Sequence, residues 1–236
     1  MISLTNVNKK YDGRVKALID VSFNVQQGEF VYLVGPSGAG KSTLLKLLTR
    51  EETLTSGTIR MGNMQVEKIA ANKLYLLRRQ IGIVMQKDLF IPYYSVFENI
   101  TYCLEAVGIT GLQKEKRGLE VLGLVGMTAH KNKMLQELSI GQQKKIAIAR
   151  ATVNHPSVLI ADEPTANLDT KSSAEIMKLF FRLNQKGTTI IMATHDSTMV
   201  NSIRKRVLEL QGGRLIRDDH DGGYTSYADP KDIYIW

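Results

Sequence analysis

The feature that most constrains the fold of this chain is the segment Gly35-Pro36-Ser37-Gly38-Ala39-Gly40-Lys41-Ser42-Thr43. It follows an apolar run at residues 30–34, precedes a helical pattern at residues 42–50, and has the spacing G-x-x-x-x-G-K-[ST]. The glycines let backbone N–H groups turn inward around an anion, and the positive end of the next helix adds to the attraction. A strand, a loop and a helix in this order therefore predict a phosphate site.

Within this loop the sequence predicts separate roles for Lys41 and Ser42. Lys41 is expected to reach the β- and γ-phosphates of a nucleotide, and Ser42 to give an oxygen to Mg²⁺. The alternative is an unrelated glycine-rich turn before a helix. That alternative does not account for the lysine, the serine and both flanking elements together.

Further short apolar runs at residues 81–85, 158–161 and 189–193 have the character of strands buried on both faces, which favours a parallel sheet covered by helices. Alternation at residues 2–7 and 21–25 predicts an antiparallel β layer before this core. A hairpin at 206–217, turning at Gly212-Gly213, is expected to close the sheet edge. The fold class is therefore α/β.

Strand signals disappear between about residues 88 and 155, where residues 96–109 and 114–125 have helical periodicity. We expect one domain, with the α/β core at 1–87 and 156–217, an inserted helical subdomain at 88–155, and a tail at 218–236. A stripe that faces the core is expected at Ile176, Leu179, Phe180 and Leu183.

Composition limits the setting in which the chain works. With one cysteine, no long apolar stretch and no apolar N-terminal segment, the 236 residues are expected to form a soluble cytoplasmic protein in a reducing compartment. The net charge of +8 favours anionic partners, which include nucleotide phosphates, nucleic acid and an anionic membrane face. Because no basic run has the length of a nucleic-acid tail, we expect mostly solvated basic faces and no nucleic-acid partner.

Two acidic residues complete the predicted site. Asp162 and Glu163 end the apolar run at 158–161. Asp162 is expected to hold Mg²⁺, directly or through water, and Glu163 to act as the general base that polarises the attacking water. Taken alone, adjacent acids after a strand also fit surface residues or a helix cap.

The segment Leu138-Ser139-Ile140-Gly141-Gln142-Gln143 resembles the LSGGQ signature of ABC ATPases, and the other motifs of that family follow in its order. The resemblance implies a P-loop NTPase with a RecA-like parallel core. It implies that Tyr11 stacks on adenine, that Gln86 lies in the Q-loop near the metal and the water, and that His195 acts in catalysis. It also implies that Ser139, Gly141, Gln142 and the D-loop residue Asp169 contact ATP held by a second copy, so that ATP binding forms a homodimer.

The signature segment also predicts a local structure, and it differs from the family at one residue. Ser139 and Gln142 have the spacing of a capping box, which predicts the start of a helix through Arg150. Ile140 stands where the family usually has glycine. Its β-branched side chain is expected to alter the closed geometry or to slow turnover, without affecting nucleotide and Mg²⁺ binding within one subunit.

Several stretches resemble a subfamily of ABC ATPases that acts in cell division: Thr49-Arg50-Glu51-Glu52, Leu76-Leu77-Arg78-Arg79-Gln80-Ile81-Gly82, Lys178-Leu179-Phe180 and Ile190-Ile191-Met192-Ala193-Thr194-His195-Asp196. The resemblance implies a permease-like membrane partner docked near residues 87–97, a peripheral position on the inner membrane face, and mechanical control of peptidoglycan hydrolases. ATPases of lipoprotein-release or macrolide-efflux exporters have similar sequences in these stretches and remain the alternative.

Three other functions are open to a chain of this kind. A P-loop kinase needs a second-substrate pocket and explains neither the signature nor the D-loop. A soluble ABC protein that acts on DNA or ribosomes usually has a coiled coil or a second cassette. A scaffold that closes on ATP and barely hydrolyses it is supported by Ile140 alone.

His130, His155 and His220 match no motif and are expected at the surface.

Overall fold

The computed structural model describes residues 1–12 and 14–224. They fall into two compact units, and each is described by itself. The first unit comprises Met1–Arg78 and Thr189–Trp236, and the second comprises Arg79–Thr188. The helical segment expected at 88–155 lies inside the second unit, which also contains two strands and a long helix. A separate subdomain with boundaries at 88 and 155 stays a prediction.

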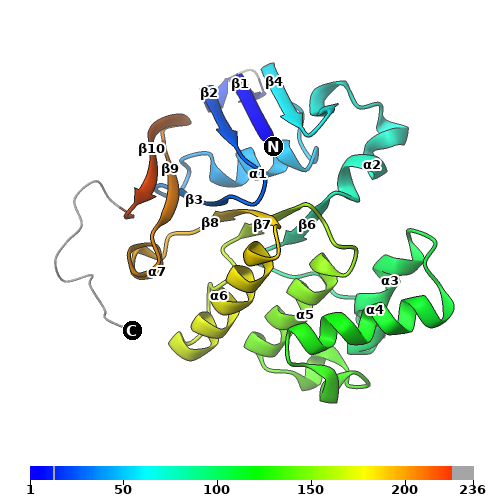
Figure 1. Cartoon of the computed structure of the whole chain (residues 1–236). Coiled ribbons are helices and arrows are strands. Elements are labelled where there is room, and N and C mark those ends of the chain that lie inside the picture. Colours follow the sequence, from blue (N-terminus) through cyan, green and yellow to red (C-terminus); the bar gives the residue numbers. More distant parts are fainter. Residues whose placement is uncertain (13, 225–236) are drawn as a thin grey trace. The chain divides into compact units, whose positions relative to one another are not determined.

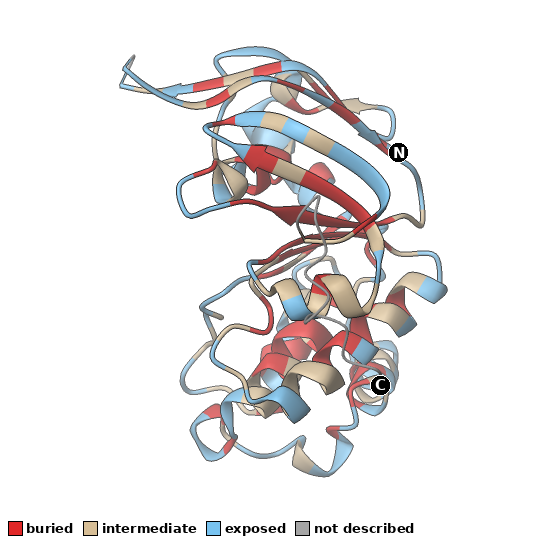
Figure 2. Ribbon diagram, turned by 90° about the vertical axis from the view of Figure 1, so that its left-hand side faces the viewer, coloured by how far each residue is buried: buried red, intermediate tan, exposed pale blue. Residues whose placement is uncertain are grey.

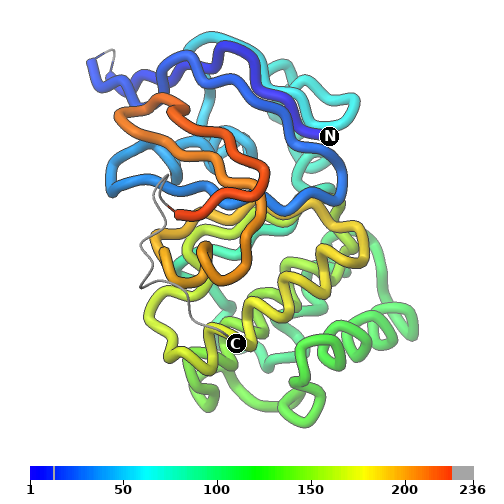
Figure 3. Tube along the Cα trace, turned by 60° about the vertical axis from the view of Figure 1, so that its left-hand side comes forward, coloured from blue at the N-terminus to red at the C-terminus, as the bar shows by residue number. Residues whose placement is uncertain are grey.

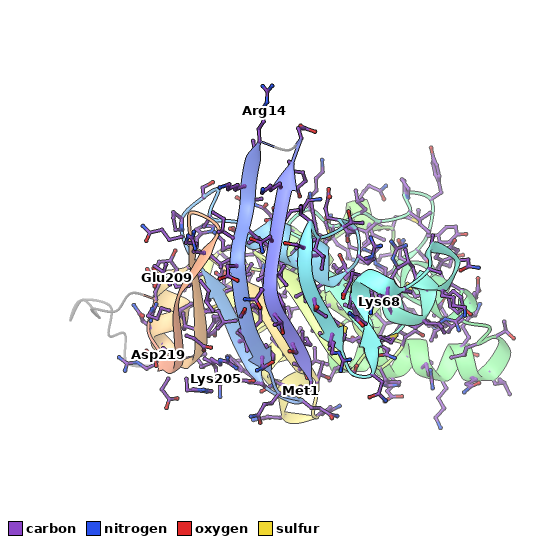
Figure 4. All side chains as sticks on the ribbon, turned by 90° about the horizontal axis from the view of Figure 1, so that it is seen from above. Met1, Arg14, Lys68, Lys205, Glu209 and Asp219 are labelled. Atoms are coloured by element: carbon purple, nitrogen blue, oxygen red, sulfur yellow. The ribbon has the colours of Figure 1, made fainter. Side chains whose placement is uncertain are left out.

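An antiparallel sheet opens the first unit, as alternation predicted. Its strand order is β2 (Val15–Val25), β1 (Ile2–Tyr11), β4 (Ser56–Met61) and β5 (Met64–Gln65). Ile2, Leu4 and Val7 are buried on β1, and Val21, Phe23 and Val25 on β2. Residues two apart point to the same face of a strand, and a register shift between Leu4 and Val7 accounts for the odd spacing on β1, so these side chains form one apolar face. Figure 4 shows β1 and β2 extending together to the hairpin tip at Arg14.

The parallel part of the first unit is built around β3 (Phe30–Val34), which pairs in parallel with β8 (Thr189–Ala193) and with β9 (Lys205–Gln211). Every residue of β3 and β8 is buried, and Figure 2 shows these central strands in red. Burial on both faces explains why their sequences are continuous apolar runs. The expected parallel core is therefore confirmed. After β3, the helix α1 (Lys41–Leu48) buries four leucines.

The C-terminal hairpin is longer than the sequence indicated. β10 (Arg214–Gly222) pairs antiparallel with β9, so the strand includes five residues that were assigned to a tail. Arg206 explains the difference, because its Nε and Nη2 donate to the two carboxylate oxygens of Asp218 at 2.6 and 2.7 Å. Such a bidentate pair holds polar residues in a strand without apolar alternation. Residues 225–236 of the expected tail lie outside the described residues.

This hairpin also contacts the antiparallel sheet of the same unit. The amide of Ile19 donates to the carbonyl of Gly213 at 2.8 Å, and Figure 3 shows the hairpin beside β2. The close approach explains the glycine: a Cβ at residue 213 would lie 2.8 Å from the carbonyl oxygen of Ala17.

The second unit pairs β6 (Ile81–Val84) in parallel with β7 (Val158–Asp162). Its helices are α3 (Val96–Glu105), α4 (Gly111–Leu124), α5 (Ile140–Thr152) and α6 (Thr170–Gln185), shown in Figure 1. The predicted helices at 96–109 and 114–125 are confirmed, although α3 ends earlier, before Gly108 with its positive φ of 83°. The apolar stripe on α6 is confirmed as buried.

Short helices complete the elements: α2 (Leu74–Arg78) and α7 (Ser197–Ser202) in the first unit, with single 3-10 turns in both units. Among the described residues, no helix is both long enough and apolar enough to span a bilayer.

Candidate functional site

The loop from residue 35 to residue 43 has the local geometry of an anion cradle. It leaves the carboxyl end of β3 and enters α1, and Gly35 and Gly40 have φ angles of 136° and 107°. A Cβ at residue 35 would lie 2.1 Å from the carbonyl oxygen of Leu210, and one at residue 40 would lie 2.6 Å from that of Ala17. Only glycine fits both the backbone conformation and the space at these two positions.

The charges of this loop favour an anion. α1 has no acidic residue in its first turn, and its N-cap, Gly40, offers no side chain. Lys41 Nζ donates to the carbonyl oxygens of Gly35 at 2.6 Å and Pro36 at 3.2 Å, so the ammonium is held over the loop. The positive helix end and the ammonium together attract phosphate groups. Ser42 is exposed in the same turn.

His195 follows the strand next to the loop. Ala193 of β8 pairs with Leu33 of β3, and the amide of Thr194 donates to the carbonyl of Leu33 at 3.2 Å. Because parallel strands end at the same edge, His195 and the phosphate loop leave the sheet from adjacent carboxyl ends, where α/β proteins bind ligands. The His195 side chain is exposed, and Asp196 caps α7 through the amide of Met199 at 2.9 Å.

In the second unit, Gln86, Asp162 and Glu163 also share one edge. Val84 of β6 pairs with Ala161 of β7, so Asp162 at the end of β7 and the residues that follow both strands lie at the same edge. Glu163 has a φ of 48°, a left-handed conformation that a glutamate rarely adopts. Strain of this kind is retained where surrounding structure fixes a side chain, often at functional sites. The structure thus brings the predicted carboxylates and the Q-loop glutamine to one edge.

The signature segment forms the predicted capping box. Ser139 Oγ accepts from the amide of Gln142 at 3.3 Å, and Gln142 Oε1 accepts from the amide of Ser139 at 3.0 Å. Ile140 follows with 61% of its surface exposed. The start of α5 is therefore ordered by its own sequence and displays an apolar side chain.

The D-loop lies beside the signature. Asp169 caps α6, accepting from the amide of Ser172 at 2.9 Å and from its hydroxyl at 2.6 Å. These hydrogen bonds, led by the one from the hydroxyl, lower the pKa of Asp169. A Cβ added to Gly141 would lie 3.0 Å from Ser172 Oγ, so the two helix starts are in close contact.

Lys144 matches no motif in the sequence, yet it is buried on α5. Its ammonium donates to the carbonyl oxygens of Met85 at 2.8 Å and Gln86 at 3.3 Å, and it pairs with Asp88. Burial raises the pKa of Asp88 despite the opposing effect of this lysine. The signal was helical spacing, since Lys144 lies one turn before the buried Ala147 and Ile148. The lysine thereby holds the Q-loop backbone against the signature helix.

The other histidines divide into two groups. His155 and His220 are exposed as expected, whereas His130 is half-buried with its Nδ1 atom inside, so it lies at the surface only in part. Met127 and Val125, which precede it, are buried and draw the turn inward. Among residues 1–12 and 14–224, no three His, Cys, Asp or Glu side chains cluster as a metal site.

A glycine-rich phosphate loop between β3 and α1, with acidic residues after a parallel strand, defines a P-loop nucleotide-binding protein. The chain belongs to the ABC transporter family, whose model matches residues 18–166.

Its relatives include proteins with one shared name. The cell division ATP-binding protein FtsE of Streptococcus pneumoniae serotype 2 strain D39 is 47% identical over 95% of this chain and 97% of its own length. FtsE of Bacillus subtilis strain 168 is 44% identical over 96% of this chain and 100% of its own length.

Solved structures agree in fold. The ATP-binding cassette MJ0796, solved as a dimer in a post-hydrolysis state bound to ADP and Pi, has a TM-score of 0.84 and 34% identity, covering 94% of this chain and 100% of that one. CbiO1 from Clostridium perfringens, part of the ABC transporter complex cbiONQ, has a TM-score of 0.85 and 32% identity, covering 93% of this chain and 88% of that one. The expected ABC ATPase fold is therefore confirmed.

Proposed function

We propose that this chain is the ATP-binding and ATP-hydrolysing subunit of an ABC-type membrane complex that acts in cell division. The observation that carries the proposal is the phosphate loop, where glycine-only geometry, an uncapped helix start and the Lys41 ammonium combine. Kinship with proteins named FtsE supports the cell-division role.

For the nucleotide, the proposal assigns binding roles within the first unit. Tyr11 stacks on the adenine ring, and residues 35–43 surround the phosphates with backbone N–H groups. Hydrogen bonds from Lys41 Nζ to the carbonyl oxygens of Gly35 and Pro36 hold the ammonium over the loop, close to where the phosphates are proposed to bind.

The metal role goes to Ser42, Gln86 and Asp162. A hydroxyl, an amide oxygen and a carboxylate are hard oxygen donors of the kind that Mg²⁺ prefers. Three ligands from the protein are enough for Mg²⁺, because waters and phosphate oxygens supply its other ligands. When bound, Mg²⁺ neutralises charge on the phosphates. Ser42 lies in the first turn of α1, Gln86 follows β6, and Asp162 is the last residue of β7.

For hydrolysis, Glu163 accepts a proton from the attacking water, and Gln86 and His195 orient that water and the terminal phosphate. The strained backbone of Glu163 supports this role, since a left-handed residue directs its side chain differently from the strand before it. Lys41 stabilises the charge that develops on the transferred phosphoryl group.

Two copies are proposed to close around ATP. Ser139, Gly141, Gln142 and Asp169 of one copy contact ATP bound to the other, and the capped start of α5 supplies a positive helix end for the terminal phosphate. The dimeric MJ0796 structures support this arrangement. ATP binding then favours the pair, and hydrolysis releases it.

The membrane partner is proposed to be an FtsX-like permease that docks near residues 87–97 at the inner membrane face. Leu89 and Tyr93 are 75% and 89% exposed there, and an apolar and aromatic surface suits an interface. Through this contact, cycles of ATP binding would regulate peptidoglycan hydrolysis with no solute carried. The alternative, a lipoprotein-release or macrolide-efflux exporter, keeps the ATPase and replaces the partner.

Affinity capture of the tagged chain from solubilised membranes of its native host tests the proposal. Mass spectrometry is expected to find an FtsX-like protein, and Leu89→Ser with Tyr93→Ser is expected to abolish its recovery. The matched control is Tyr75→Ser on α2, where another exposed aromatic is removed. Recovery of an exporter permease instead would contradict the cell-division role and support the exporter alternative.

A further inference from the structure

Lys9 contacts the aromatic ring to which the adenine site is assigned. Its ammonium lies 4.5 Å from the ring centroid of Tyr11, so the two side chains lie together although the register of β1 shifts between Lys9 and Lys10. Lys9 is only 7% exposed, whereas the intervening Lys10 is exposed. A buried cation over an aromatic face is a cation–π contact shielded from water.

Two further contacts fix the position of this cation. Lys9 Nζ donates to Glu52 Oε2 at 2.8 Å and to the carbonyl oxygen of Thr53 at 2.8 Å. The amide of Glu52 in turn donates to the carbonyl of Lys46 in the last turn of α1. The chain of contacts therefore runs from the end of the phosphate-binding helix, through Glu52 and Lys9, to the ring of Tyr11.

We propose that Lys9 is a positioning residue for the nucleotide base: it holds Tyr11 by one face so that the other face stacks on adenine. The inference rests on the proposed ATP site and adds to it a residue that does not touch ATP. Two consequences follow from the geometry. The ring is kept at a set distance from the phosphate loop, and the cation withdraws electron density from the ring, which favours stacking with an electron-rich purine.

The test compares Mg-ATP with inorganic tripolyphosphate, which has the phosphates but no base. Calorimetry on the purified full chain is expected to show that Lys9→Met weakens ATP binding by about 5-fold, the size of a lost cation–π contact, and leaves tripolyphosphate binding unchanged. The matched control is Lys10→Met, which makes the same change of charge at the neighbouring, exposed position of β1 and is expected to bind both ligands as wild type does.

Two more variants separate positioning from general stability. Lys9→Arg keeps a cation over the ring and is expected to recover most of the ATP affinity. In a Tyr11→Leu background, Lys9→Met is expected to have no further effect on ATP, because the ring through which it acts is gone.

Each outcome decides between the proposals. Equal weakening of ATP and tripolyphosphate by Lys9→Met, or additive losses in the double variant, would overturn the role of Lys9, as would unchanged ATP affinity. The ATP site itself is tested separately by Lys41→Ala, which is expected to lose both ligands. Wild-type protein that binds neither ligand would overturn the proposed function and not merely the role of Lys9.

Discussion

Ile140 is the residue at which this chain departs from its family in the signature. It is 61% exposed at the first position of α5, where the proposed ATP contact across the dimer forms. A β-branched side chain keeps the backbone farther from a phosphate than glycine does. Ile140→Gly is therefore expected to raise kcat for ATP severalfold, with unchanged nucleotide affinity of the monomer. A steady-state ATPase assay measures this, and unaltered turnover would mean that Ile140 is accommodated in the closed state.

Glu163 gives the sharpest prediction for chemistry. Glu163→Gln removes the proposed general base while retaining size and a hydrogen-bonding end group. We expect hydrolysis to fall by about 100-fold or more, in the range of general-base catalysis, while Mg-ATP still binds. Phosphate release measures the expected loss of hydrolysis, and ATP binding measured on the same preparation checks that Mg-ATP still binds. A variant with near wild-type turnover would exclude Glu163 as the base.

At the scale of elements, the signature helix and the Q-loop are joined by a buried ion pair. The side chains of Lys144 and Asp88 are 5% and 9% exposed. Lys144→Met leaves Asp88 buried without its partner, at a cost of about 3 kcal/mol in unfolding free energy.

Lys145 on the same helix is the matched control for this prediction. Its pair with Glu175 is more exposed, so Lys145→Met is expected to cost less than about 1 kcal/mol. Denaturant unfolding of both variants tests the contrast. Equal costs would show that burial of the Lys144 pair has no energetic importance.

The start of α3 carries a pH-dependent cap. Ser95 Oγ accepts from the amide of Glu98, and Glu98 Oε2 accepts from the hydroxyl and from the amide of Ser95. These last two hydrogen bonds, led by the one from the hydroxyl, lower the pKa of the Glu98 carboxylate. A lowered pKa in the folded state contributes stability above the unfolded value, and that contribution is lost as pH falls through the folded value.

For this cap, wild type is expected to have a higher Tm than Glu98→Gln at about pH 6, with the difference shrinking below about pH 4.3, the unfolded pKa of glutamate. Thermal unfolding of both proteins across this window measures it. A difference that stays constant with pH would show that ionisation of Glu98 has no part in the cap.

At the scale of the whole molecule, the proposal requires two copies. With hydrolysis blocked by Glu163→Gln, Mg-ATP is expected to convert the protein to a dimer, whereas ADP leaves it monomeric. Sedimentation or light scattering distinguishes the two states. Ser139→Ala provides the control, since removing the cap at the start of α5 weakens the proposed contact with the opposite ATP. A strictly monomeric Glu163→Gln variant in saturating Mg-ATP would contradict the arrangement.

The local features of this protein were determined by its sequence. Apolar runs predicted β3, β6, β7 and β8, since a strand buried on both faces needs apolar residues throughout. The phosphate loop and the Ser139 capping box could also be predicted from the sequence, because each depends on residues close together in the chain. The order of motifs was enough to predict the family.

Only the tertiary structure decided the features that depend on partners far apart in the chain. Polar residues at 218–222 became strand because Arg206 binds Asp218, and Lys144 was buried because it meets Asp88 and two carbonyl oxygens. Likewise, Lys9 is buried against Tyr11 and Glu52, although a lysine is expected to face solvent. Local patterns report which face a residue occupies, whereas a buried charge is stabilised by groups that only folding brings to it.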